Sequence, residues 1–128
     1  MVQWHIIIAQ LTRERPNEAC GLLAGVGGVV QRVYPIDNIL LSPVAYEMEP
    51  HAQVRAMTEI EAQGWEITAI YHSHPAGPPT PSPTDIAQAY YPDSLYLICA
   101  PHGNGEWRGR AFWIVDGAVA EVAVAIES

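Results

Sequence analysis

The chain has 128 residues, of which 49% are hydrophobic and 16% charged, a combination typical of one globular domain spanning residues 1–128. Six Lys and Arg against fourteen Asp and Glu give a formal net charge of −8. This sign disfavours nucleic acid and anionic lipid as partners. The longest apolar run near the start covers residues 6–9 and no basic segment precedes it, so we expect no signal peptide, no membrane span and a cytoplasmic protein.

The two cysteines, Cys20 and Cys99, form no CxxC pair. The sequence therefore carries the signature of neither a disulfide framework nor a structural zinc knot. We expect both cysteines to be small buried apolar residues, and the sequence leaves open whether they pair.

The start of the chain predicts a helix followed by a β-hairpin. Residues 2–14 have helical spacing of apolar side chains, and Pro16 ends the pattern. These apolar side chains are Trp4, Ile7, Ile8 and Leu11. Strands at 20–26 and 29–36 then flank Gly27-Gly28, a dipeptide typical of a hairpin turn.

The middle of the chain predicts a loop, a helix and a strand. Residues 37–49 have no regular pattern, and a helix follows from Pro50 to Gln63, with proline in its first turn and Gly64 as its stop. We expect its apolar side to consist of Val54, Met57 and Ile60. Residues 66–72 then form a short, mostly buried strand.

The last part of the chain predicts one short helix and three strands. Ile86 and Tyr90 lie four residues apart on a helix that Pro92 ends. The strands are expected at 94–100, 109–115 and 118–126, with Asp116-Gly117 as a tight turn between the last two. We therefore predict an α/β or α+β fold with a single mixed sheet, antiparallel hairpins and helices over the sheet faces.

Residues 72–85 read HSHPAGPPTPSPTD, and their five prolines exclude a helix interior or a central strand. If the preceding strand continues to His74, the side chains of His72 and His74 project from the same face, because strand side chains alternate. The Gly- and Pro-rich stretch 75–81 predicts a sharp return loop. That loop brings the following residues back beside the end of the strand.

Ser82 and Asp85 have the spacing of a helix start. Ser82 as N-cap, Pro83 at the first helical position and Asp85 at the third match the S/T-x-x-D/E pattern. Asp85 therefore lies in the first turn of a helix, where its charge also suits the helix dipole.

The imidazoles of His72 and His74 and the carboxylate of Asp85 would be three ligands for one metal ion. Three protein ligands are one fewer than tetrahedral zinc takes, which leaves a position for water, as in catalytic zinc sites. Zinc in such a site lowers the pKa of its water to about 7. A general base is also required, and it should be a carboxylate that is not a ligand.

Each of these residues also has a simpler interpretation. Ser82 and Asp85 can form a capping box alone, His72 can be a buried histidine with satisfied hydrogen bonds, and His74 can be an exposed turn residue. The combination favours the metal site, because chance rarely supplies H-x-H, a compact return loop and S-x-x-D in this order.

The same residues resemble the JAMM metalloprotease family, also called MPN+ or JAB domains. HSHP, then seven residues between His74 and Ser82, then S-x-x-D is similar to the signature of that family. RPNEACGLLAG at 15–25 resembles the segment that carries the catalytic glutamate of the family, and YEMEP at 46–50 resembles the segment before its second helix. The likeness runs from the first helix to at least Ala100.

The resemblance implies a cytidine-deaminase-like JAB/MPN fold and one Zn²⁺ per chain, held by His72, His74 and Asp85. It further implies that Glu18 acts as general base and acid on the zinc-bound water, and that the Ser82 hydroxyl stabilises the tetrahedral oxyanion. Without the resemblance, Glu18 would be interpreted as an exposed acidic loop residue.

The activity that the resemblance implies is hydrolysis of the amide bond after the flexible C-terminal tail of a ubiquitin-like protein. Stand-alone bacterial domains of this type process ubiquitin-like sulfur carriers, so we expect a sulfur-carrier tail as the partner. The identity of the carrier, the residue on the leaving side of the bond and the oligomeric state stay open.

Other classes match the sequence less well. Fe(II) oxygenases usually have H-x-D/E and a distant histidine, and base deaminases need H-x-E with P-C-x-x-C. RadC-like proteins share H-x-H-P and S-x-x-D but resemble a longer chain with an N-terminal helical DNA-binding region. A non-catalytic MPN-type scaffold is the alternative to an enzyme, although such relatives have typically lost ligands and all five positions are present here.

Overall fold

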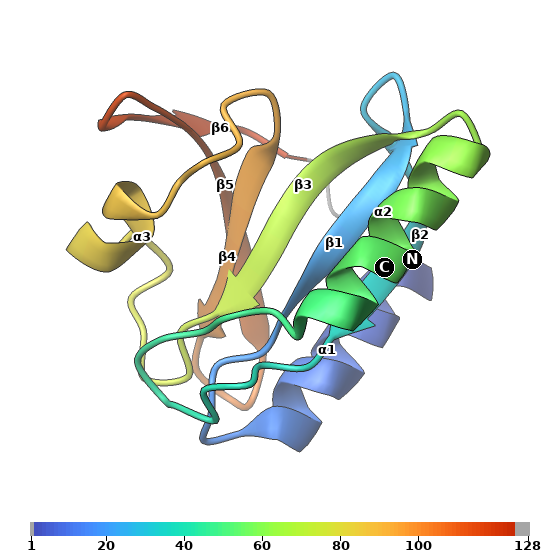
Figure 1. Cartoon of the computed structure of the whole chain (residues 1–128). Coiled ribbons are helices and arrows are strands. Elements are labelled where there is room, and N and C mark those ends of the chain that lie inside the picture. Colours follow the sequence, from blue (N-terminus) through green and yellow to red (C-terminus); the bar gives the residue numbers. More distant parts are fainter. Residues whose placement is uncertain (1, 125–128) are drawn as a thin grey trace.

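The computed structural model describes residues 2–124, which form one six-stranded sheet with helices on both faces (Figure 1). The strand order is β2-β1-β3-β4-β5-β6, and β3 and β4 form the one parallel pair of the described sheet. The elements are α1 (Val2–Glu14), β1 (Cys20–Val26), β2 (Val29–Ile36), α2 (Pro50–Ala62), β3 (Glu66–Ser73), α3 (Pro83–Ala87), β4 (Leu95–Pro101), β5 (Trp107–Val115) and β6 (Ala118–Val122). The predicted mixed sheet with antiparallel hairpins and flanking helices is confirmed.

The two faces of the sheet carry separate hydrophobic cores. Helix α1 covers one face, where Ile7 and Leu11 are buried with Leu23 and Tyr71. Helix α2, loop 37–49 and α3 lie over the other face (Figure 1). Buried side chains of all the inner strands form the core there, among them Leu22, Ile70, Ile98 and Phe112. Side-chain alternation along β3 places His72 on this second face with Ile70.

Helix α2 begins at a side-chain cap. Glu49 accepts hydrogen bonds from the backbone N–H groups of His51, at 3.1 Å, and Ala52, at 2.6 Å, and Pro50 occupies the first helical position. The predicted apolar side of this helix is wrong at Val54, which is 62% exposed. The buried side instead contains Ala56 and Ile60, because the helical period places residue 54 on another side of the helix.

The two predicted hairpin turns form as expected. Gly27 and Gly28 have φ of 61° and 80°, and Asp116 and Gly117 have φ of 50° and 81°. Positive φ at both central residues is the geometry of a type I′ turn, which favours glycine and tolerates aspartate. The turns therefore fix the registers of β1 with β2 and of β5 with β6.

The C-terminal part corrects two predicted boundaries. Helix α3 ends at Ala87, and Tyr90 lies outside it, 74% exposed. The backbone N–H of Tyr91 donates to the hydroxyl of Tyr96 on β4 at 3.1 Å, which replaces a helical hydrogen bond. Strand β6 ends at Val122 rather than at residue 126, and residues 125–126 lie outside the described part of the chain.

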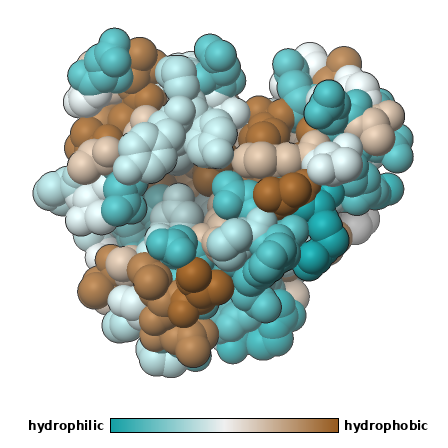
Figure 2. Space-filling view, viewed as in Figure 1, coloured by the Kyte–Doolittle hydropathy of each residue, from teal (hydrophilic) through white to brown (hydrophobic). Residues whose placement is uncertain are grey.

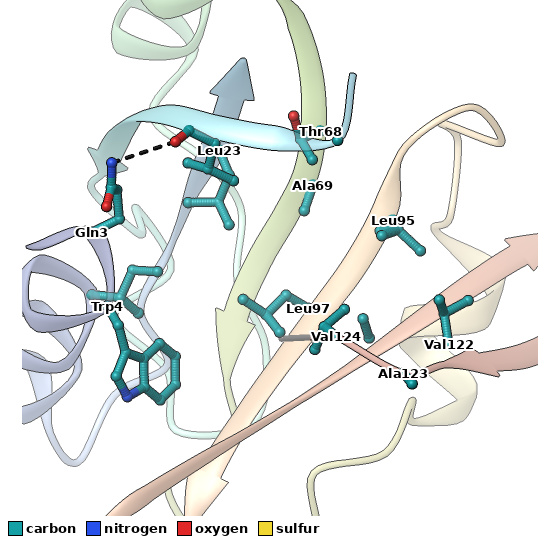
Figure 3. Close-up of a pocket in the computed structure, with 14 residues that line it drawn as sticks. Gln3, Trp4, Leu23, Thr68, Ala69, Leu95, Leu97, Val122, Ala123 and Val124 are labelled. Atoms are coloured by element: carbon teal, nitrogen blue, oxygen red, sulfur yellow. Dashed lines mark hydrogen bonds between the residues drawn. The ribbon is translucent and has the colours of Figure 1, made fainter. Parts of the chain in front are cut away.

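An apolar groove of about 380 Å³ lies on the α1 face, between α1 and the segment that follows β6 (Figure 3). Trp4 and Leu23 line one side of it, and Leu97, Val122 and Val124 line the other. Among residues 2–124, none of the helices has the length and apolarity that a membrane crossing requires.

The two cysteines are free and buried, and they belong to different cores. Cys20 lies in the core under α2 and Cys99 in the core under α1, so the sheet separates them. Burial raises the pKa of each thiol to about 12. Each side chain is therefore a protonated, unreactive thiol at neutral pH.

We predict that the native protein does not react with Ellman's reagent at pH 8, because both thiols are buried and protonated. After denaturation in guanidinium chloride, two thiols per chain should titrate. Reaction of a thiol in the native state at the rate of free cysteine would contradict the burial, and fewer than two thiols after denaturation would indicate a disulfide.

Candidate metal centre and active site

The register between β1 and β3 determines which side chains meet at the end of the sheet. Cys20 lies opposite His72 in this antiparallel pair. Two residues back along β1 therefore correspond to two residues forward along β3, which places Glu18 across from His74. Two hydrogen bonds between Ser73 and Ala19 hold the two segments in this register. Ser73 N–H donates to Ala19 O at 2.9 Å, and Ser73 Oγ accepts from Ala19 N at 2.9 Å.

Three predicted ligand atoms converge at this end of the sheet. His72 Nε2 lies 3.1 Å from His74 Nε2, and Asp85 Oδ2 lies 3.3 Å from the first nitrogen and 3.1 Å from the second. Strand β3 ends at Ser73, one residue beyond the predicted strand 66–72 and one residue before His74. His74 N still donates to Cys99 O on β4 at 2.8 Å. The two imidazoles therefore converge as alternation along the strand predicts.

Each of the three groups is held by contacts of its own. His74 Nδ1 lies 2.8 Å from the carbonyl oxygen of Pro78 in the return loop, which favours the tautomer with a lone pair on Nε2. Asp85 completes a capping box with Ser82, in which Asp85 Oδ2 accepts from Ser82 N at 2.8 Å and Ser82 Oγ accepts from Asp85 N at 3.0 Å. His72 is 1% exposed, and its ring stacks on Tyr46 at a centroid distance of 4.6 Å.

The electrostatics of the cluster favour a neutral imidazole at His72 and an anionic carboxylate at Asp85. Burial lowers the pKa of His72. Burial would raise the pKa of Asp85, but hydrogen bonds to the two histidines outweigh it and hold that pKa below its usual range. For His74, burial is outweighed by hydrogen bonds to Asp85 and Pro78, so its pKa is raised.

Glu18 is a second, separate carboxylate beside this cluster. It is 4% exposed, and its Oε1 has no hydrogen-bond partner among the described residues. Burial raises its pKa to about 7, with a lowering by His74 and a smaller increase from Asp85. Its backbone is fixed to loop 37–49, because its N–H donates to Ser42 O at 2.8 Å and its carbonyl accepts from Asn38 Nδ2 at 3.0 Å.

The donor set and its spacing fit a metal ion. Ligands about 2.0–2.2 Å from a tetrahedral ion lie roughly 3.3 Å apart, and the three measured separations are 3.1, 3.1 and 3.3 Å. Ligand atoms of Glu18, His72 and His74 also lie within 4.8 Å of one another. A carboxylate oxygen of Glu18 therefore lies close enough to the two imidazoles to contact the same ion or a water bound to it.

A hollow of about 390 Å³ opens beside the cluster, between loop 37–49 and the return loop. Glu18, His74 and Ser82 lie on its walls together with Val44. Loop 37–49 also presents an exposed apolar surface, which is brown at the lower left of Figure 2. That surface consists of Ile39, Leu40, Leu41 and Val44.

Sequence reasoning missed the residues that orient the predicted set. Tyr46 stacks on His72, and Asn38 holds loop 37–49 through hydrogen bonds with the backbone of Glu18, Leu40, Ala45 and Glu47. Ser73 lies between the two histidines in the sequence, but nothing in the spacing indicates that its hydroxyl accepts a hydrogen bond from Ala19, the residue before β1. Glu18 itself was found through the resemblance, and its burial contrasts with the exposed loop residue that the sequence alone suggested.

The fold and this group of side chains together define the class of JAB-type hydrolases. The chain belongs to the family of prokaryotic homologues of the JAB domain, since the model of that family matches residues 3–115.

Three curated relatives match most of the chain. A desampylase of Haloferax volcanii is 39% identical over 118 residues, which cover 88% of this chain and 80% of the relative. A probable TtuB-protein conjugate cleaving protease of Thermus thermophilus is 41% identical over 119 residues, which cover 92% of this chain and 74% of the relative. A CysO-cysteine peptidase of Mycobacterium tuberculosis is 35% identical over 120 residues, which cover 92% of this chain and 82% of the relative. All three names describe enzymes, and two of them state a peptidase or protease activity.

Solved structures support the fold. The solution structure of protein DSY2949 from Desulfitobacterium hafniense superposes with a TM-score of 0.86 at 34% identity, over 98% of this chain and 89% of that one. A JAB1/MPN domain protein of Archaeoglobus fulgidus, AF2198, gives a TM-score of 0.59 at 16% identity, over 95% and 91%. The predicted JAB/MPN fold is therefore confirmed.

We predict that Ser73→Ala lowers the free energy of unfolding by about 1–3 kcal/mol, because the buried N–H of Ala19 loses its acceptor. Urea denaturation followed by circular dichroism measures the change. Ser42→Ala is the matched control, since Ser42 Oγ accepts an exposed hydrogen bond from Val44 N, and its effect should stay within about 0.5 kcal/mol. Equal effects of the two substitutions would refute a clamping role for Ser73.

Proposed function

We propose that the chain is a zinc-dependent peptidase that hydrolyses the amide bond after the C-terminal tail of a ubiquitin-like protein, with a sulfur carrier as the substrate class. The observation that carries this proposal is the triangle of His72 Nε2, His74 Nε2 and Asp85 Oδ2, with sides of 3.1 to 3.3 Å, beside the buried carboxylate of Glu18. The relatives support it, because one is named for cleaving TtuB conjugates and another for cleaving CysO-cysteine.

In this proposal His72, His74 and Asp85 hold one Zn²⁺ per chain. Zinc bound there supplies Lewis acidity and a water with a pKa near 7. The contacts of the three residues with Tyr46, Pro78 and Ser82 orient their donor atoms toward one point. Such supporting contacts hold metal ligands in place and tune their basicity.

Glu18 and Ser82 perform the proton transfer and charge stabilisation. Glu18 is the general base that takes a proton from the attacking water and returns it to the leaving nitrogen, and its raised pKa of about 7 suits both steps. Ser82 Oγ accepts from Asp85 N and keeps its own hydrogen free. That O–H is the donor toward the oxyanion that forms at the scissile carbonyl.

The substrate tail enters the hollow between Val44 and the return loop, where Glu18, His74 and Ser82 surround the scissile bond. An extended tail beside the sheet end presents its last carbonyl without disturbing the fold. We assign residues 1–128 to one domain, and the cytoplasmic location stays a prediction.

The non-catalytic scaffold and the RadC-like alternatives are less well supported. A scaffold has no use for a buried carboxylate without a hydrogen-bond partner, because such a group is costly to bury. Two of the relatives reported above are named for a protease or peptidase activity, and none of the three is named as RadC-like.

We predict that His74→Ala abolishes stoichiometric zinc binding, because it removes one of three ligands. The wild-type protein should bind about one zinc per chain, measured by inductively coupled plasma mass spectrometry after dialysis. His102→Ala is the control, since His102 is exposed and lies in a turn after β4, and it should keep its zinc. Zinc retained by His74→Ala at full stoichiometry would refute the assigned ligand set.

We predict that Glu18→Gln lowers the rate of cleavage by about 10²- to 10⁴-fold while zinc stays bound, because a positioned base contributes that much. The assay incubates zinc-loaded protein with sulfur carriers extended at their C-termini and reads cleavage by intact mass. Glu61→Gln, which removes an exposed carboxylate of α2, should cut like the wild type. Equal rates for Glu18→Gln and wild type would show that the role of Glu18 is wrong.

A further inference from the structure

A second pocket also borders Glu18, and its other lining residues differ from those of the hollow beside His74. It has a volume of about 450 Å³ and lies between the end of α1, the segment that leads into β1, and loop 37–49. Four carboxylates line it, and no Lys, Arg or His does. These carboxylates belong to Glu14, Glu18, Asp37 and Glu49.

Two of the four carboxylates are available to a ligand. Glu49 is occupied by the cap of α2, and Glu18 is the buried base. Asp37 is exposed and forms no ion pair within residues 2–124. Glu14 has only a weak contact, with Arg13 Nε at 3.9 Å, and Arg13 does not line the pocket. The negative charge of Asp37 and Glu14 is therefore largely uncompensated.

These charges gather at the start of β1. Glu18, Asp37 and Glu14 all act electrostatically on the thiol of Cys20 and add to the burial that raises its pKa. Between the carboxylates, the pocket has apolar walls formed by Ile36, Ile39 and Leu41. An apolar wall that ends at carboxylates suits a Lys or Arg side chain, because its aliphatic stem packs on the wall while its charged head pairs.

Glu18 connects this pocket to the bond that is cleaved. It lines both this pocket and the hollow that also contains His74 and Ser82. Glu18 is 4% exposed, and its Oε1 has no hydrogen-bond partner among the described residues. A substrate bound at the catalytic cluster can therefore extend past Glu18 into the acidic pocket.

The products of amide hydrolysis indicate which part of a substrate would lie in the acidic pocket. Water supplies its oxygen to the carbonyl carbon, the C–N bond breaks, and a proton passes to the nitrogen. The tail leaves as a carboxylate and the other side leaves as an amine, which is an ammonium at neutral pH. Carboxylates near the leaving side favour a positively charged group there.

We propose that the acidic pocket of Glu14 and Asp37 binds a basic side chain on the leaving side of the scissile bond. The favoured substrate is then a carrier joined to a lysine in a basic segment of a target protein, rather than a carrier with a short neutral extension. This inference rests on the proposed peptidase function and specifies the side of the substrate that the sequence left open.

The test uses matched isopeptide conjugates of one ubiquitin-like carrier. The carrier is joined to a lysine that is flanked by two arginines, by two serines or by two glutamates. Wild-type protein should cut the arginine-flanked conjugate with the highest kcat/KM. Asp37→Asn and Glu14→Gln should each lower kcat/KM for that conjugate by about two- to fivefold and leave the serine-flanked conjugate unchanged. The preference should shrink as salt rises, because these carboxylates are partly exposed.

Glu61→Gln removes the same charge outside the pocket and should leave the preference unchanged. Melting temperatures verify that the variants fold. Fluorescence polarisation with the same conjugates gives a second readout that does not depend on cleavage. Equal binding and equal cutting of the arginine- and serine-flanked conjugates by wild type would overturn the inference while the peptidase function stands. Tighter binding of the arginine-flanked conjugate without cleavage of any conjugate would support the pocket and refute the proposed function.

Discussion

The register of β1 against β3 is the constraint on which the rest of the site depends. Cys20 lies opposite His72, and this pairing carries Glu18 to the level of His74. A slip of one residue would turn the side chains of the shifted strand to the other face of the sheet. The two hydrogen bonds between Ala19 and Ser73 fix the register at the point where it matters most. The position of Glu18 relative to His72 and His74 thus depends on the register of the sheet.

Asp85 shows how one carboxylate can belong both to a helix cap and to a cluster of candidate metal ligands. Its Oδ2 accepts the hydrogen bond from Ser82 N that completes the capping box, and the same oxygen lies between the two imidazoles. The simple capping interpretation and the metal interpretation are therefore compatible. Helix α3 has only five residues, too few to be stable alone, so its cap and the packing of Ile86 on the sheet determine where it forms.

Local signals predicted most of the fold. Helical spacing, glycine turns and proline stops gave the bounds of α1, β1 and β2 as the structure has them. The errors came where tertiary contacts decide. Val54 is apolar but lies off the buried side of α2. The helix before Tyr90 ends early, at Ala87, and the N–H of Tyr91 donates to the hydroxyl of Tyr96 on β4.

In the candidate site, too, local sequence patterns predicted some residues, whereas others depend on contacts between distant segments. Spacing alone indicated the two imidazoles and the carboxylate, since alternation along a strand and a capped helix start are local rules. The stacking of Tyr46, the clamp of Ser73 and the hydrogen bonds of Asn38 depend on contacts between distant segments. The gathering of Glu14 and Asp37 beside Glu18 likewise depends on how α1 and loop 37–49 meet, which no single stretch of sequence encodes.

The proline-rich return loop has a thermodynamic consequence. Stretch 75–81 contains Pro75, Pro78, Pro79 and Pro81, so it has few conformations to lose when the chain folds. His74 directly before this stretch and Asp85 in the first turn of α3 after it are held by Pro78 and Ser82 through contacts that need no ion. Most of the ordering entropy is thus lost when the polypeptide folds rather than when an ion is captured. Affinity for the ion can then approach the intrinsic strength of its coordination bonds, unlike in small zinc domains whose folding consumes part of that strength.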